Sequence, residues 1–102
     1  MLIHLPIVIL AALPTTTNKI ADNVPKFDIL RECRSEGGSK AVLDSCAADE
    51  AGARDQLQQQ WVQFNPLDKS VCIRETNIDG SPSYVELLTC LEMARDAKNL
   101  RK

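Results

Sequence analysis

The sequence SKAVLDSCAADEAGARDQLQQQWVQF, residues Ser39–Phe64, decides the fold. Its apolar residues recur three, four or seven positions apart, which is the spacing of one face of an α-helix: they are Leu43, Cys46, Ala53, Leu57, Trp61 and Phe64. The other face carries charged residues and glutamines, which suit a solvated helix surface. We predict a helix of about 39 Å that begins at Ser39 as N-cap and is most prone to bend at Gly52.

A shorter helical pattern precedes this segment. Residues 25–35 predict a helix with Pro25 in its first turn, and the glycine pair at 37–38 ends it. Its expected apolar side consists of Phe27, Ile29, Leu30 and Cys33.

Two further helices are expected after Phe64. Asn65 can cap the first of them, with Pro66 in the first helical position and the end near Asn77, and its inward side is predicted to be Leu67, Val71 and Cys72. The second opens at Ser83 with a capping box, in which the Ser83 hydroxyl and the Glu86 carboxylate each satisfy a backbone N–H. Its apolar stripe is Tyr84, Leu87, Leu88, Leu91 and Ala94. The sequence therefore predicts an all-α fold, a small bundle of three to four helices, formed by residues 22–102 as a single domain.

The four cysteines are Cys33, Cys46, Cys72 and Cys90, and their separations are 13, 26 and 18 positions. Zinc sites usually take close pairs such as C-x2-C, and a redox dithiol takes C-x-x-C, neither of which occurs here. If the chain is exported, an even number of cysteines in a small domain predicts two disulfides instead.

The pairing of the cysteines can be argued from helix lengths. If the helix after Asn65 folds back along the long helix, Cys72 lies about 18 Å from Cys46, well beyond the roughly 7 Å that a disulfide allows between Cα atoms. We therefore favour Cys33–Cys46 and Cys72–Cys90. The nested pairing, Cys33–Cys90 with Cys46–Cys72, stays open if the long helix breaks near Gly52.

An apolar stretch stands at the start of the chain. Residues 2–13 are apolar except for His4, a length that suits a signal peptide core and falls short of the ~20 residues that span a bilayer. We therefore interpret residues 1–21 as a leader and expect a periplasmic or secreted protein, without a stable membrane span in its mature form. The alternatives are that this stretch is a buried element of the domain or that the start codon is misplaced.

Charge and composition exclude several classes of function. Lysine and arginine number 12 and aspartate and glutamate 14, giving a net charge of −2 without a basic face, so we expect no nucleic-acid partner. The single histidine, His4, lies in the leader, which removes histidine-based catalysis and histidine metal ligands from the rest of the chain. We expect no catalytic residue, no cofactor and no metal.

The remaining candidates for acid–base chemistry are the carboxylate pairs Asp49 with Glu50 and Asp44 with Glu50. A solvated helix face or an ion pair explains them better. Glu50 shares the apolar side with Cys46 and Ala53, and we expect its carboxylate to reach water at the rim of the core.

Trp61 and Phe64 are the candidate partner-binding residues, because a small helical protein with little core can expose its aromatic residues to a partner. Packing of both rings in the core is the competing interpretation, and the pattern favours it.

Three stretches, EGGSKAVLDSC (36–46), W-x-x-F (61–64) and SPSYVELLTCLEMARD (81–96), carry a resemblance. On them the segment 27–96 resembles a group of small four-cysteine bacterial proteins predicted to be periplasmic or secreted, for which no activity is known. The resemblance implies the same cysteine pattern and a conventional leader, although the present leader lacks a basic start. The mitochondrial coiled-coil-helix modules do not fit, because their cysteine spacers differ.

These observations lead us to expect a non-catalytic, exported helical protein of the bacterial envelope. Its first expected role is that of a protein-binding module, such as a stress factor, an inhibitor or a chaperone-like protein. A structural or accessory subunit without its own activity is the alternative, and a carboxylate-dependent enzyme is the remote one.

Overall fold

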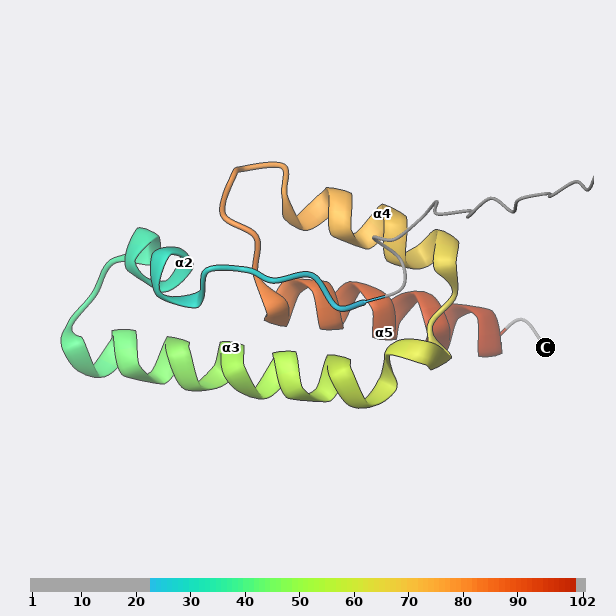
Figure 1. The fold of residues 1–102 in the computed structure, drawn as a ribbon, viewed down its shortest axis with the longest axis horizontal. Coiled ribbons are helices and arrows are strands. Elements are labelled where there is room, and N and C mark those ends of the chain that lie inside the picture. Colours follow the sequence, from blue (N-terminus) through green and yellow to red (C-terminus); the bar gives the residue numbers. More distant parts are fainter. Residues whose placement is uncertain (1–22, 101–102) are drawn as a thin grey trace, which may run out of the picture.

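A computed structural model describes residues 23–100, so the expected leader lies outside the described residues. The elements in chain order are α2 (Ile29–Glu36), α3 (Lys40–Gln60), the 3-10 helix η1 (Trp61–Gln63), α4 (Pro66–Thr76) and α5 (Tyr84–Leu100) (Figure 1). Within the described part of the chain there is no strand, and the prediction of an all-α bundle is confirmed.

The long helix α3 begins as predicted, with the Val42 N–H donating to the Ser39 side chain. Gly52, the position most prone to a bend, shows none, since α3 continues through this residue without a break (Figure 1). Gly52 is exposed and flanked by alanines, which are strong helix formers, so a single glycine is tolerated. The α-helix gives way to η1 at Trp61, slightly before the predicted end at Phe64.

The short helix α2 begins four residues later than predicted. Asp28 is its N-cap, and the Asp28 carboxylate accepts a hydrogen bond of 3.1 Å from the Arg31 N–H. The residues before it, 24–28, form an extended segment that we call the N-terminal strap. The backbone of the strap is held by hydrogen bonds to the Tyr84 side chain. The Phe27 N–H donates to the Tyr84 hydroxyl (2.8 Å), and that hydroxyl donates to the Pro25 carbonyl (3.0 Å).

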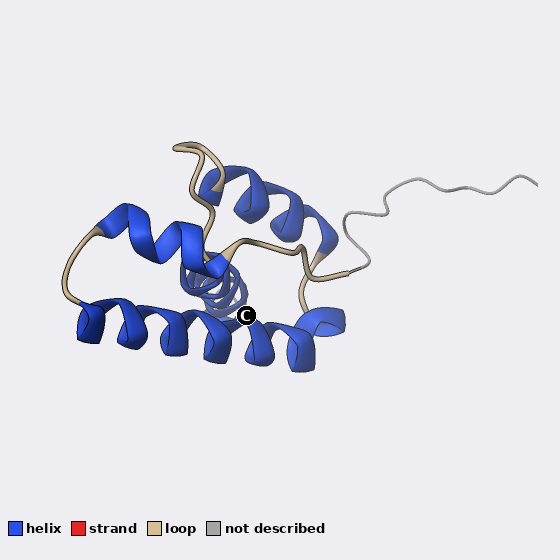
Figure 2. Cartoon of the chain, turned by 60° about the vertical axis from the view of Figure 1, so that its left-hand side comes forward, coloured by secondary structure: helices blue, strands red, loops and turns tan. Residues whose placement is uncertain are grey.

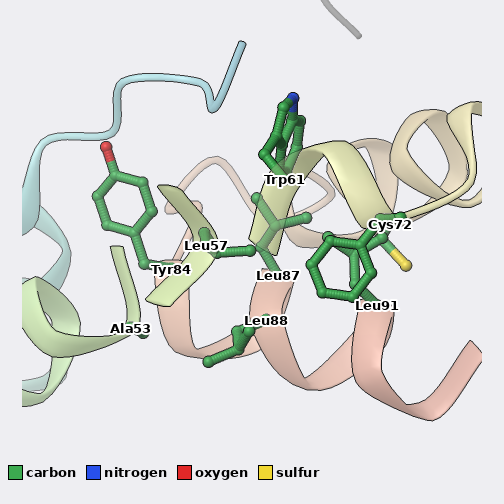
Figure 3. Packing of buried hydrophobic residues seen from close by; sticks show 9 residues of the cluster. Ala53, Leu57, Trp61, Cys72, Tyr84, Leu87, Leu88 and Leu91 are labelled. Carbon is green, nitrogen blue, oxygen red and sulfur yellow. The ribbon is translucent and has the colours of Figure 1, made fainter. Parts of the chain in front are cut away.

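The core lies where the second half of α3 meets α5 and α4. Its buried members are Ala53, Leu57, Trp61, Phe64, Cys72, Tyr84, Leu87, Leu88 and Leu91 (Figure 3). Figure 2 shows α3 from the side and α5 almost end-on, so the two helices cross rather than run parallel. Tyr84 points its hydroxyl toward the strap, which covers this side of the core (Figure 3).

The inward side of α4 differs from the prediction at Leu67, which is 70% exposed. Leu67 and Cys72 are five residues apart, which places them about 140° apart around a helix. The buried positions of α4 are Lys69, Cys72 and Thr76. Leu30 of α2 is likewise more exposed than its apolar character predicted.

Both disulfides have the favoured pairing. Cys33–Cys46 joins α2 to α3, and Cys72–Cys90 joins α4 to α5, each with a Cα–Cα distance of 5.7 Å. The nested pairing, which required the long helix to break near Gly52, is therefore wrong, because α3 is unbroken. Among residues 23–100, no helix has the length and apolar character needed to cross a membrane.

Candidate functional site

The two aromatic residues proposed for partner binding lie in the core. Trp61 and Phe64 are each only 4% exposed, and cations cover part of their rings. The Lys69 ammonium lies 4.7 Å from the centre of a Trp61 ring, and the Arg95 guanidinium lies 5.4 Å from the Phe64 ring. Lys69 is thereby buried on α4, whereas Leu67, which was predicted to face inward, is exposed. In this arrangement neither aromatic ring offers an anchor to a partner.

Glu50 is buried and caps α5, instead of reaching water as predicted. Its side chain comes from the middle of α3 and is 4% exposed. One carboxylate oxygen accepts from the Tyr84 N–H at 2.6 Å, and the other accepts from the Ser83 hydroxyl at 2.5 Å. A carboxylate at a helix N-terminus is stabilised by the unpaired N–H groups and by the helix dipole. Glu50 therefore serves chiefly to fix where α5 begins.

The predicted capping box is half correct. The Ser83 hydroxyl accepts from the Glu86 N–H at 3.2 Å, as expected. The Glu86 carboxylate was expected to accept from the Ser83 N–H, but it accepts a hydrogen bond from the Thr76 hydroxyl instead (2.8 Å). The Ser83 N–H donates to the Thr76 hydroxyl oxygen (2.9 Å). This exchange ties the end of α4 to the start of α5, a contact between distant residues that a local motif does not reveal.

Glu32 is a buried acid that sequence reasoning missed. Its pKa is raised from 4.5 to about 7, chiefly because the side chain is buried. A hydrogen bond with the Glu36 side chain and the negative charges of Glu36, Glu50 and Glu86 supply the rest of this rise. Cys46 Sγ lies 3.8 Å from the Glu32 carboxylate, but it has no proton to donate because it belongs to a disulfide. The pattern Glu32 and Glu36, one turn apart and beside Cys33, is the only signal in the sequence that could have indicated this acid.

A cavity of about 470 Å3 opens between the start of α3 and the start of α5. Its lining includes the carboxylate residues Glu36, Asp49, Glu50 and Glu86. The proposed pair of Asp49 with Glu50 thus borders one space, whereas Asp44 forms an exposed ion pair with Lys40 at 2.8 Å and does not line it.

A second cavity of about 390 Å3 lies along α5, beside the Cys72–Cys90 disulfide. Val85 and Glu86 line both cavities, so the two are neighbours, and we call the pair of depressions the α5 groove. Its apolar side chains on α5 are Val85 and Met93, with Thr89 between them. These three residues recur every four positions, on the side of α5 away from the predicted core stripe, and this spacing is the signal by which the groove could have been found.

One group of metal-ligand side chains gathers in the described part of the chain. The ligand atoms of Glu32, Cys33 and Cys46 lie within 4.8 Å of one another. Two of the three are the sulfur atoms of a disulfide, which do not offer the thiolates that zinc binds. The group is therefore a poor fit to a metal ion.

Comparison with known proteins adds no relative. No family model, no curated protein and no solved structure matches this chain.

Proposed function

We propose that this protein is a non-catalytic protein-binding module exported to the bacterial periplasm or beyond. Two disulfides in a small domain are consistent with an oxidising compartment, because cytosolic reductants keep thiols reduced. The apolar run at residues 2–13, typical of a signal peptide, supports the same proposal.

The binding surface in this proposal is the α5 groove. The observation that carries it is the exposed apolar stripe on α5, where Met93 is 66% exposed and Val85 more than one third exposed. Exposed apolar side chains that line a depression are typical of interaction sites. This surface replaces the Trp61–Phe64 end, whose rings are occupied by the core.

The same groove raises the enzymatic alternative, because acids converge on it. Two of its carboxylates are already engaged, the buried Glu50 by the start of α5 and the exposed Glu86 by Thr76. Removal of either is expected to disturb folding, whereas a catalytic acid can be replaced without loss of the fold. We therefore favour binding over catalysis.

Site-specific photo-crosslinking in the host tests the proposal. A photo-reactive amino acid replaces Met93 in the groove, and the control replaces Val62, an 88% exposed residue in η1 that does not line it. We expect Met93 to crosslink to one discrete protein and Val62 to give none. Crosslinks of equal yield at both positions, or none at Met93, contradict a binding role for the groove and favour the structural or accessory subunit.

The proposed compartment has its own measurement, which is the intact mass of protein recovered from the host with and without reduction and alkylation. We expect a shortened N-terminus, no alkylation before reduction and alkylation of all four cysteines after it. Thiols that react before reduction contradict export to an oxidising space.

A further inference from the structure

We propose that the α5 groove binds a cationic, amphipathic helical segment of its partner protein, one with lysine or arginine flanking an apolar side. This inference rests on the proposed function and names the chemistry of the partner.

The first argument is charge. No lysine, arginine or histidine is among the residues that line the groove. Five of the lining residues are acids, namely Glu36, Asp49, Glu50, Glu75 and Glu86. The whole chain, by contrast, is nearly balanced, with 12 basic and 14 acidic residues. The negative charge is therefore concentrated at this surface, which attracts a cationic partner and repels an anionic one.

The second argument is shape. Val85, Thr89 and Met93 follow one line along α5 for about 12 Å, a little more than two helical turns. Val42 of α3 extends the apolar lining at the end nearest α2. A helix laid along such a line contacts it through positions spaced three and four residues apart, which is the known helix-in-groove mode.

The third argument is the position of the acids relative to the stripe. Glu75 reaches the groove from α4 and Asp49 from α3, while Glu86 lies on α5 itself. The apolar stripe is thus bordered by carboxylates that come from three helices. A segment with apolar residues on one side and cations on its flanks matches both features together, whereas a purely apolar or purely basic segment matches only one.

The test measures binding of a defined probe to the oxidised full-length chain. The probe is a fluorescein-labelled peptide of about 14 residues, made of leucine and lysine at helical spacing. Its counterpart has glutamate in place of lysine. Fluorescence anisotropy is expected to show binding of the lysine peptide alone, and this binding is expected to weaken as salt is raised.

Two matched double variants separate the groove from overall charge. Asp49→Asn with Glu75→Gln removes two acids of the groove, and Asp44→Asn with Asp55→Asn removes two exposed acids elsewhere on the chain. We expect the first pair to weaken binding about 3- to 10-fold and the second less than about twofold.

The apolar side of the proposal has its own matched pair. Met93→Ser is expected to weaken binding about 3- to 10-fold, because it removes an apolar contact, and Val62→Ser is expected to leave it unchanged.

Several results overturn this inference: no binding of the lysine peptide, equal binding of the glutamate peptide, or equal effects of the two double variants. The segment crosslinked at Met93 distinguishes its failure from that of the proposed function. A basic amphipathic segment supports both proposals, whereas an acidic or uncharged one overturns the cationic partner and leaves the binding role intact. Absence of any crosslink at Met93 contradicts the binding role itself.

Discussion

The two halves of α3 are held to the rest of the molecule in different ways. The second half contributes Ala53, Leu57 and the adjoining Trp61 to an apolar core shared with α4 and α5. The first half packs against α2 through the Cys33–Cys46 disulfide, and its neighbours there include the buried acid Glu32. One helix thus carries a region stabilised by apolar burial and a region stabilised by a covalent bond.

This difference shows that the two disulfides of this small domain act in different ways. An isolated helix of eight residues, such as α2, is unstable in water, because helix nucleation is costly and few hydrogen bonds follow. The disulfide supplies what packing does not, by keeping α2 against α3. At the other end, Cys72–Cys90 adds to a core in which Cys72 is already buried.

Shortening one leucine in each half gives the largest expected contrast. Leu57→Ala leaves a cavity at a fully buried site of the core and is expected to lower the free energy of unfolding by about 2–5 kcal/mol. Leu43→Ala, at a half-buried site of the first half, is expected to cost about 1 kcal/mol or less. Chemical denaturation of both variants measures the difference, and equal losses would mean that the two halves are packed alike.

Removing the disulfides one at a time sharpens the comparison further. Replacement of Cys72 and Cys90 by serine is expected to lower the global free energy of unfolding by about 2–4 kcal/mol. Replacement of Cys33 and Cys46 is expected to cost about 1–2 kcal/mol globally, because the loss is limited to what α2 contributes.

Hydrogen exchange distinguishes the two cysteine variants. Loss of Cys33–Cys46 is expected to remove protection from the amides of α2 while those of α5 stay protected. If α5 loses its protection to the same extent, the first half of α3 is not an independent region.

The pH dependence of stability tests the first half of α3 through its neighbour Glu32. The folded pKa of about 7 exceeds the ordinary 4.5, so the folded state binds the proton more tightly than the unfolded state. This contribution to stability is complete below about pH 4.5 and is lost as the pH rises through 7, at a slope of up to about 1.4 kcal/mol per pH unit.

Glu32→Gln is expected to remove this slope, because glutamine is neutral at every pH. The variant is then more stable than the wild type at pH 8 and similar at pH 4, as thermal or chemical unfolding across this range can measure. Asp44→Asn, which changes an exposed acid paired with Lys40, serves as the control and is expected to keep the wild-type slope. Parallel curves for the wild type and Glu32→Gln would contradict a raised pKa at this site.

Local chemistry made much of the fold predictable. Ser39 and Asn65 cap helices where their side chains suggested, and Pro66 occupies the first position of α4. The core-facing apolar stripe of α5, which begins at Tyr84, was also recognisable, because helical spacing depends only on residues a few positions apart. The start of α2 was missed because Tyr84, 57 residues away from Phe27, holds the strap in an extended form.

The candidate site was much less predictable than the fold. Glu50 was singled out, but its role as the cap of α5 depends on a helix that begins more than 30 residues later. Lys69 was missed because its burial depends on the Trp61 ring beneath its ammonium group. The α5 groove was missed because it is formed by residues of several helices.

The sequence by itself determined that the fold is all-α, where α3 and α4 are capped and which disulfide pairing is favoured, since periodicity, capping and the reach of a disulfide are short-range constraints. Only the tertiary structure decided which charged side chains are buried and where acids and apolar residues meet on the surface. The physical reason is that burial and the local electric field depend on every group nearby in space, whichever helix it comes from.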